Sequence, residues 1–240
     1  MTPWGLIVAG GSGERMRRSG SDVVKPLVSV GGRALLEHNV NALLAHGLDR
    51  IAVAISAAHD DVRAFVETRG AELIAAAGGT LQLIVEERPL GSIGAAPQVG
   101  DGEADEIVVV NADNVTTLDL ADLLAEHRRA GADATLAVHE EPFAMPFGEI
   151  ALDGARVVAY LEKPTYRITV ATAVTVLGRG AVALVESGER IDLPILANRL
   201  LDRDRPVHAY VHDAPWVDVN DLAAASRAEA MLSALAGGKG

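Results

Sequence analysis

The segment from residue 6 to residue 27 concentrates residue types that bind phosphate. A short apolar stretch, Leu6–Ala9, leads directly into the glycine-rich stretch Gly10–Gly13. Glycines have no Cβ, so successive backbone N–H groups can approach an anion closely. Arg15 and Lys25 follow and supply positive charge, Arg15 as a planar fork and Lys25 as a point charge. Together these residues predict a site for a nucleoside triphosphate at the end of a buried strand.

Two familiar glycine motifs do not describe this segment. A P-loop requires G-x-x-x-x-G-K-[ST], and the chain contains no Gly-Lys-Ser or Gly-Lys-Thr. The dinucleotide fingerprint G-x-G-x-x-G needs a third glycine where this chain has Met16. A tight strand-to-helix turn without a ligand is the alternative interpretation of the glycines when they are taken alone.

The order of motifs along the chain resembles that of the sugar-1-phosphate nucleotidylyltransferases. That family opens with G-G-x-G-T-R-L and continues with P-K-P-L. The chain matches both, except that Glu14 replaces the usual threonine and Val24 replaces the proline before Lys25. The further matches, in the family's order, are Pro89–Ala95, Asn111–Asp113, Gly148-Glu149, Glu162–Pro164 and Trp216–Val219. Each match is weak alone, and the five in order carry the resemblance.

The resemblance implies Mg²⁺-dependent transfer of a nucleotidyl group from an NTP to a sugar 1-phosphate. Asp113 and Asp218 match the pair that holds the metal, while Lys25 is expected at the α-phosphate and Arg15 at the β- and γ-phosphates. Lys163 is expected to bind the phosphate of the acceptor. The remaining expected nucleotide-binding residues are Ala9, Gly10, Gly11, Gly13, Gly91 and Ser92. The expected acceptor-binding residues are Gly148, Glu162, Lys163 and Thr172.

Several of these residues also have a simpler structural interpretation. Asp113 can cap the turn after its strand, and Asp218 can cap the helix that starts near Asn220. Lys163 can be an exposed lysine in a proline turn. The Pro89–Ala95 segment can be a turn that caps a helix beginning at Ser92.

One departure from the family concerns the acceptor. On the strand after Glu-Lys-Pro the family commonly carries Asn-Ala-Gly-Ile-Tyr, and here the nearest match is Ala171–Thr175. A site that loses a polar contact usually changes its ligand rather than its chemistry. The alternatives are therefore an unusual sugar, a cyclitol phosphate or phosphocholine as acceptor. A further alternative is a non-catalytic nucleotide-sugar sensor, which the presence of all the expected charged residues disfavours.

Composition narrows the class of protein. A chain of 240 residues can bury a sizeable core, and we expect one domain over 1–240. Within it we expect a nucleotide-binding half over about 1–133, an acceptor-binding half over about 134–220 and a terminal helix over 221–236. The 21 basic and 33 acidic residues give a net charge of −12, which argues against nucleic acid as a partner. With no cysteine, disulfides and thiolate metal sites are excluded.

Hydrophobic patterning predicts an α/β fold. Buried strands are expected at 50–55, 81–85 and 107–110, and helices at 34–46, 60–69 and 118–130. This alternation predicts a three-layer α/β/α sandwich with a mostly parallel mixed sheet, in which ligands lie at the carboxyl ends of the strands. The expected strands of the second half are 135–139, 148–152, 157–162 and 168–177. They predict an antiparallel extension over the nucleotide-binding half.

Targeting, membrane and assembly signals are weak. No apolar run approaches the roughly 18 residues of a membrane span, and the first residues lack a signal-peptide pattern. We therefore expect a soluble cytoplasmic protein without a membrane partner, either a monomer or a homodimer. The loop at 86–91 looks closer to guanylyl- and uridylyl-transferring members than to thymidylyl ones, but the sequence does not identify the base.

Overall fold

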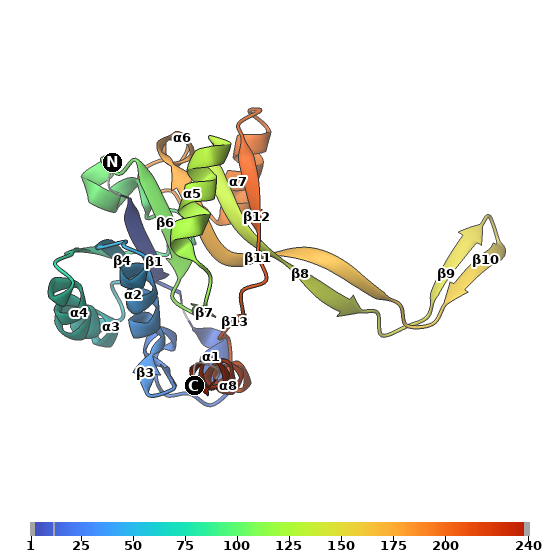
Figure 1. Cartoon of the computed structure of the whole chain (residues 1–240), viewed down its shortest axis with the longest axis horizontal. Coiled ribbons are helices and arrows are strands. Elements are labelled where there is room, and N and C mark those ends of the chain that lie inside the picture. The colour runs from blue at the N-terminus through green and yellow to red at the C-terminus, as the bar shows by residue number, and fades with distance from the viewer. Residues whose placement is uncertain (1–2, 12, 238–240) are drawn as a thin grey trace.

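A seven-stranded mixed sheet forms the centre of the protein (Figure 1). The computed structural model describes residues 3–11 and 13–237. In spatial order the strands are β12 (Val207–Val211), β8 (Ala134–Ala144), β11 (Thr165–Gly178), β6 (Glu106–Asn111), β1 (Trp4–Ala9), β4 (Arg50–Ser56) and β5 (Thr80–Glu86). Strand β11 runs antiparallel to both of its neighbours, and the remaining pairs are parallel. The expected mostly parallel mixed sheet is confirmed.

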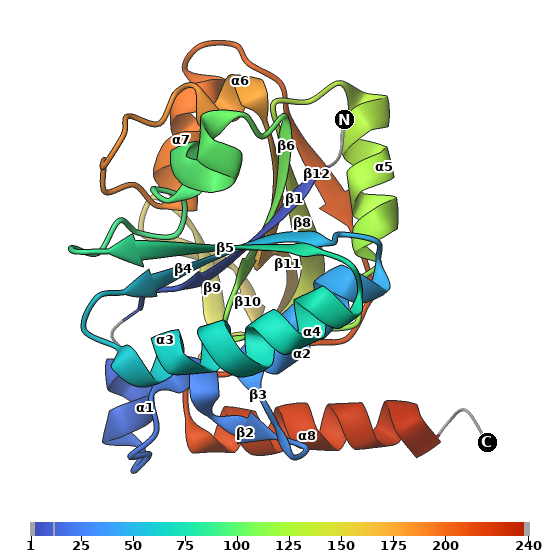
Figure 2. The same ribbon diagram turned by 90° about the vertical axis from the view of Figure 1, so that its left-hand side faces the viewer.

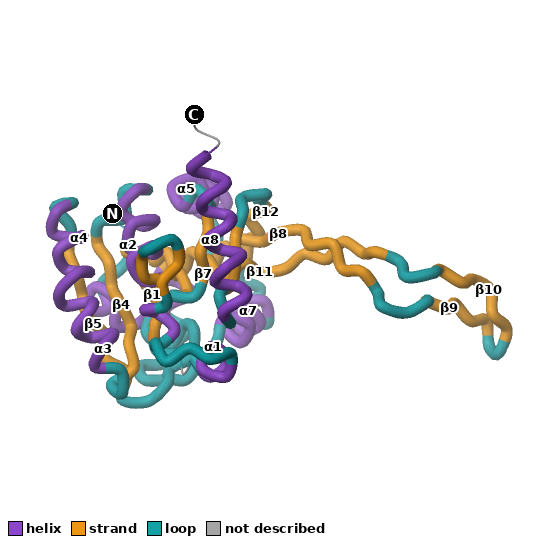
Figure 3. The backbone as a smooth tube through the Cα atoms, turned by 90° about the horizontal axis from the view of Figure 1, so that it is seen from below, coloured by secondary structure: helices purple, strands orange, loops and turns teal. Residues whose placement is uncertain are grey.

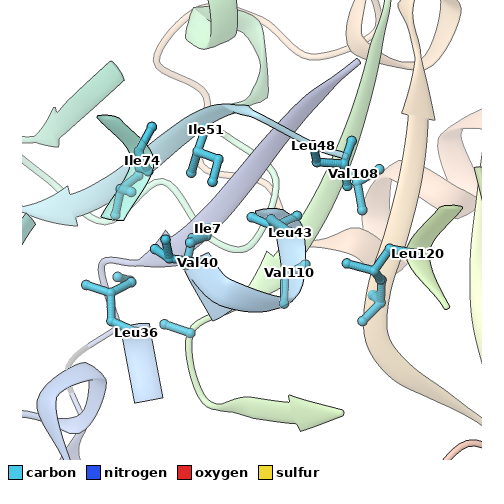
Figure 4. Packing of buried hydrophobic residues seen from close by; sticks show 14 of the residues in the cluster. Ile7, Leu36, Val40, Leu43, Leu48, Ile51, Ile74, Val108, Val110 and Leu120 are labelled. Carbon is cyan, nitrogen blue, oxygen red and sulfur yellow. The ribbon is translucent and has the colours of Figure 1, made fainter. Parts of the chain in front are cut away.

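Helices cover both faces of this sheet (Figure 2). On one face lie α2 (Leu35–Ala45), α3 (Asp60–Phe65), α4 (Ala71–Ala76) and α5 (Leu120–Ala130). On the other lie a 3₁₀ segment (Ala96–Gly102), α6 (Arg179–Val182) and α7 (Leu193–Leu201). Alternation along β1 sends Ile7 to the first face, against Leu36, Val40 and Leu43 of α2 (Figure 4), and Leu6 to the second. The three-layer arrangement is therefore confirmed.

Helix boundaries differ from the expectation in three places. The helix expected at 60–69 continues through a π-helical segment, Val66–Gly70, into α4. Residues 91–95 form turns, so no helix begins at Ser92. Helices α6 and α7 were not expected, although Asp192 before Pro194 is a helix-start signal. Across the part of the chain that the structure describes, no helix has the length and apolar character needed to span a bilayer.

A third, smaller cluster joins the N-terminal loop to the C-terminal helix. It includes Met16 of α1 (Glu14–Arg18), Val219, and Ala228 of α8 (Leu222–Gly237). The remaining elements of this region are the 3₁₀ segment Lys25–Leu27, β2 (Ser29–Val30), β3 (Arg33–Ala34), β7 (Asn114–Thr116) and β13 (Trp216–Asp218). This packing holds Lys25 and Asp218 at the same edge of the sheet. Ser12 and residues 238–240 of the expected loose tail lie outside the described residues.

Strands β8 and β11 continue beyond the sheet as a two-stranded ribbon. Its end is the hairpin of β9 (Glu149–Asp153) and β10 (Arg156–Leu161). We refer to residues 140–171 as the arm. The sequence correctly indicated antiparallel strands here, but the expectation that they cover the nucleotide-binding half is wrong for this structure, because the arm projects away from the body (Figures 1 and 3).

Candidate active site

A cavity of about 540 Å³ opens at the carboxyl ends of β1, β4, β5 and β6. This volume is within the usual range for small-molecule sites. The cavity is lined by Val8, Gly10, Gly11, Arg17, Ser56, Ala58, His59, Glu86, Pro89, Gly91, Ser92, Asn111, Asp113, Arg190 and Asp192. The glycine loop, the Gly91-Ser92 pair and Asp113, which the sequence singled out separately, therefore share one cavity.

The glycine loop is held between Glu86 and Lys25. A Cβ on Gly10 would lie 2.8 Å from Glu86 Oε2, so a larger residue at this position would have to displace that carboxyl. Gly13 has a φ of 61° and precedes α1, and a Cβ there would lie 3.2 Å from the Cβ of Lys25. Gly13 is thus favoured by its backbone conformation, and Gly10 lets the backbone pass beside Glu86.

Four polar side chains form a continuous hydrogen-bonded chain beside this loop. Lys25 Nζ donates to Asp113 Oδ2 at 2.5 Å and also to the amide oxygen of Asn220. The Asn220 amide nitrogen in turn donates to Asp218 Oδ2. Antiparallel pairing of β7 with β13 aligns Asp218 with Asn114, the residue after Asp113. The chain Asp113–Lys25–Asn220–Asp218 therefore joins three segments that are distant in sequence.

The carboxylates of Asp113 and Asp218, at the two ends of this hydrogen-bonded series, influence each other. Asp218 is open to solvent on one side, but the protein atoms around it reduce its hydration. This burial, and secondarily the charge of Asp113, raise the pKa of Asp218, while Lys25 and Arg15 act in the opposite direction. A cation would relieve the repulsion between the two acids. The described residues contain no group of three or more metal-binding side chains, so a cation here would take its remaining oxygen ligands from water or substrate.

Arg15 and Arg17 differ in their relation to the cavity. Arg17 lines it, whereas Arg15 is exposed on α1 and is absent from the lining. Arg15 nevertheless lies close enough for its charge to lower the pKa of Asp218. Arg190 adds a second cation to the lining. Two separate segments therefore contribute positive charge to the cavity lining.

Glu86 is a buried acid at the back of the cavity. Its side chain is 5% exposed, and its Oε2 accepts a hydrogen bond from the Leu90 N–H at 3.2 Å. Its Oε1 has no hydrogen-bond partner among the described residues. Burial raises the pKa of Glu86. The sequence marked the loop that begins here but gave no reason to single out this carboxyl.

The Gly91-Ser92 pair is fixed by the segment before α7. The Ser92 N–H donates to Asp192 Oδ1 at 2.8 Å, and the Ser92 hydroxyl oxygen accepts from the Leu193 N–H at 3.0 Å. A Cβ on Gly91 would lie 2.5 Å from the Ile191 carbonyl oxygen. The Gly91-Ser92 pair, which was expected to bind the nucleotide, is therefore held in place by residues that no local sequence signal links to it.

The expected acceptor residues do not join this cluster. Gly148, Glu162 and Lys163 lie at the far part of the arm, where the Tyr160 hydroxyl donates to Glu162 Oε2 at 3.2 Å. Thr172 lies at the root of the arm and is 1% exposed. Its hydroxyl donates to the Ala137 carbonyl oxygen at 3.1 Å and contacts His212 Nε2, so it serves the fold in this structure.

The family model described as nucleotidyl transferase matches residues 4–232, nearly the whole chain. The chain belongs to this family. Among curated nucleotidyl transferases, the mannose-1-phosphate guanylyltransferase of Mycobacterium tuberculosis is 28% identical over 89% of this chain and 60% of its own length. The UTP–glucose-1-phosphate uridylyltransferase of Synechocystis is 24% identical over 90% of this chain and 60% of its own length. The chain thus spans little more than half the length of these relatives.

Two solved structures share the fold of this chain. A structure described as a putative glucose-1-phosphate thymidylyltransferase from Bacillus anthracis superposes with a TM-score of 0.73 at 21% identity, covering 95% of this chain and 94% of that one. HddC from Yersinia pseudotuberculosis, complexed with GMP-PN, gives a TM-score of 0.71 at 20% identity, covering 95% and 98%. At this identity the likeness establishes the architecture of the nucleotidyl transferase fold.

Proposed function

We propose that the protein transfers a nucleotidyl group from an NTP to a sugar 1-phosphate, yielding an NDP-sugar and pyrophosphate. The observation that carries this proposal is the Asp113–Lys25–Asn220–Asp218 chain beside the glycine loop and the cavity. Membership of the nucleotidyl transferase family and the names of the curated relatives support the same reaction class.

The reaction exchanges one phosphoanhydride bond for another. An oxygen of the acceptor phosphate attacks the α-phosphorus in line, and a new P–O bond forms. The bond from the α-phosphorus to the bridging oxygen of the β-phosphate breaks, and that oxygen leaves with pyrophosphate. Such a transfer needs positioning and charge neutralisation rather than a covalent intermediate with the protein.

We refer to the cavity and the adjacent Asp113–Lys25–Asn220–Asp218 side chains together as the cleft. Its residues supply both the positioning and the charge neutralisation. Lys25 is placed to neutralise charge at the α-phosphate, and Asn220 orients its ammonium by accepting one of its hydrogens. Arg17 and Arg190 line the cavity and are suited to the β- and γ-phosphates, with Arg15 adjacent. Asp113 and Asp218 are the pair that would hold Mg²⁺, which when bound would neutralise phosphate charge.

Glu86 suggests the order in which donors should be tested. Its unpartnered Oε1 can accept hydrogen bonds, and guanine presents N–H donors on its outer edge. Curated relatives include guanylyltransferases. We therefore propose GTP as the first donor to test, with UTP second.

The test is pyrophosphate release with Mg²⁺, combining five NTPs with a panel of sugar 1-phosphates, cyclitol phosphates and phosphocholine. Release that requires both donor and acceptor supports the proposal and identifies both. Release with a non-sugar acceptor alone would retain the chemistry and replace the acceptor. Calorimetric NTP binding without turnover on any acceptor would favour a sensor and contradict the proposal.

A further inference from the structure

The arm carries most of the exposed apolar surface. Of the sixteen large hydrophobic side chains that are exposed among the described residues, ten lie between Phe143 and Ile168. Phe147, Leu152 and Tyr160 are 72%, 62% and 60% exposed. A two-stranded ribbon has no core in which to bury such side chains. Clustered apolar and aromatic surface of this kind is typical of an interface.

The arm also has unpaired strand edges. Strand β6 pairs with β11 only over Val174–Gly178, and β12 pairs with β8 only over Ala134–Val138. Beyond these points, within the described residues, the outer edges of the ribbon have no neighbouring strand. Free edges offer backbone donors and acceptors to another chain.

The direction of the arm is built into its root. The Asn114 side-chain amide donates to the Thr172 carbonyl oxygen at 2.6 Å, and the Thr172 hydroxyl donates to Ala137. The register shifts between Ala171 and Thr175, where Ala173 has a φ of 59°. This bulge is fixed by buried hydrogen bonds, so folding the arm back over its own cleft would disrupt them.

Lys163 lies far from the cleft of its own chain. The contact between Asn114 and Thr172 places the root of the arm beside Asp113. Strand β11 is continuous from Thr165 to Thr172, which at a rise of about 3.3 Å per residue corresponds to about 23 Å. Lys163 lies beyond that, so no side chain spans the gap.

We propose that two copies of this chain exchange arms, and that Lys163 and Glu162 of the partner subunit complete the acceptor site beside Asp113. When two arms align antiparallel about a two-fold axis, the tip of each lies against the root of the other. The tip carries the residues expected at the acceptor, and the root lies beside the cleft that lacks them. We infer that the partner is a second copy of this chain, because each copy has both a tip that carries the expected acceptor residues and a root beside a cleft that lacks them. The roles of Lys163 and Glu162 rest on the proposed function.

The first test is the mass in solution and does not require turnover. Wild type is expected to sediment as a dimer, and Phe147→Ser with Leu152→Ser as a monomer, because both side chains would lie in the interface. The matched control is Ile195→Ser with Leu201→Ser, which removes two apolar side chains of similar exposure, 51% and 55%, from the body. That control is expected to remain a dimer. A monomeric wild type overturns the proposal.

The second test is complementation between two impaired chains. Asp113→Asn and Lys163→Ala chains, co-expressed with different tags, are purified through both tags as a heterodimer. One of its two sites then has an intact Asp113 and an intact Lys163 from the partner subunit. At an acceptor concentration near the wild-type KM, turnover of about half the wild-type value is expected, whereas each homodimer should stay below about a fifth of it. A heterodimer at background, alongside an active wild type, overturns the proposal.

Cross-linking separates this inference from the proposed function. Because the chain has no cysteine, two single substitutions give one reactive pair. These are Lys163→Cys in one chain and, in the other, Asp213→Cys, next to His212, which contacts Thr172 at the arm root. A short bis-maleimide is expected to join the mixed dimer and to leave each variant alone unjoined. If wild type shows no turnover with any donor and acceptor, the proposed function fails. The presence or absence of this cross-link still decides whether the two copies exchange arms.

Discussion

The cleft and the arm contrast in how their side chains are paired. In the cleft, Lys25 contacts Asp113 and Asn220, and Asn220 contacts Asp218, so the charged groups hold one another in place. On the arm, Lys163 and the surrounding apolar side chains face solvent. The proposed nucleotide side of the site is therefore pre-organised within one chain, whereas Lys163 and Glu162, the residues proposed to bind the acceptor, lie on an exposed ribbon. Four substitutions test this contrast.

The largest effect is expected at Asp113. Asp113→Asn removes charge that faces Lys25 and the proposed cation, so turnover should fall by roughly 10²–10³-fold. Pyrophosphate release measures the loss, and circular dichroism checks that the fold is unchanged. Asp202→Asn, an exposed acid at the end of α7, is the control and should retain activity. Near-normal turnover for Asp113→Asn would remove this residue from the metal site.

A smaller and more selective effect is expected on the arm. Lys163→Ala removes the charge-assisted contact proposed to the acceptor phosphate, so the KM for the acceptor should rise about 10- to 100-fold. The KM for the NTP should change little. Arg156→Ala removes a cation from the same hairpin and serves as the control. Steady-state kinetics with each substrate varied in turn makes the comparison. Equal effects on both substrates would place Lys163 in the nucleotide half instead.

Asn220 tests whether the cleft is pre-organised through its amide. Asn220→Ala leaves Lys25 with Asp113 as its sole remaining partner among the described residues of this cluster. Turnover should fall about tenfold, as for other residues that orient a group in contact with substrate. Asn198→Ala, on the exposed face of α7, is the control. Unchanged kinetics would show that Asp113 alone positions the lysine.

The smallest effect is expected on stability, at Glu86. Burial raises the pKa of Glu86, so the folded state holds a proton that the unfolded state releases as pH rises above the ordinary value of 4.5. Ionisation therefore lowers stability at neutral pH, and Glu86→Gln should add about 1 kcal/mol there, or about 2–4 °C in Tm. The gain should vanish below pH 4.5, where both states are protonated. The exposed Glu87→Gln is the control, and thermal unfolding at several pH values is the measurement. A gain that persists in acid would assign the effect to packing.

The parts of the site that sequence predicted are those with a local or topological signal. Gly10, Gly13 and Lys25 follow a buried strand at family spacing, and Asp113 follows another. The carboxyl ends of neighbouring parallel strands lie side by side at the same end of a sheet, so the glycine loop and Asp113 are expected to be close together. Asp218 depended on the resemblance alone, because nothing near it in sequence points to the cleft.

Other parts had no such signal. Asn220 and Asp192 act through single hydrogen bonds between segments far apart in sequence, which periodicity does not reveal. The pattern of β11 predicts a strand equally well in the body and in the arm. The direction of the arm is set by the bulge at Ala173 and by the amide of Asn114, both of which depend on tertiary contacts.

The continuous register between β8 and β11 in the arm, from Ala144 paired with Thr165 to Val138 paired with Ala171, restricts how this protein can evolve. Side chains alternate between the two faces of a strand, so one inserted or deleted residue would turn every residue beyond it to the opposite face. Length changes between Ala144 and the bulge must therefore occur in β8 and β11 together, and in steps of two residues per strand. We expect homologues with the same arm to differ in its length by these paired steps, since other changes would turn the tip away from the site it serves.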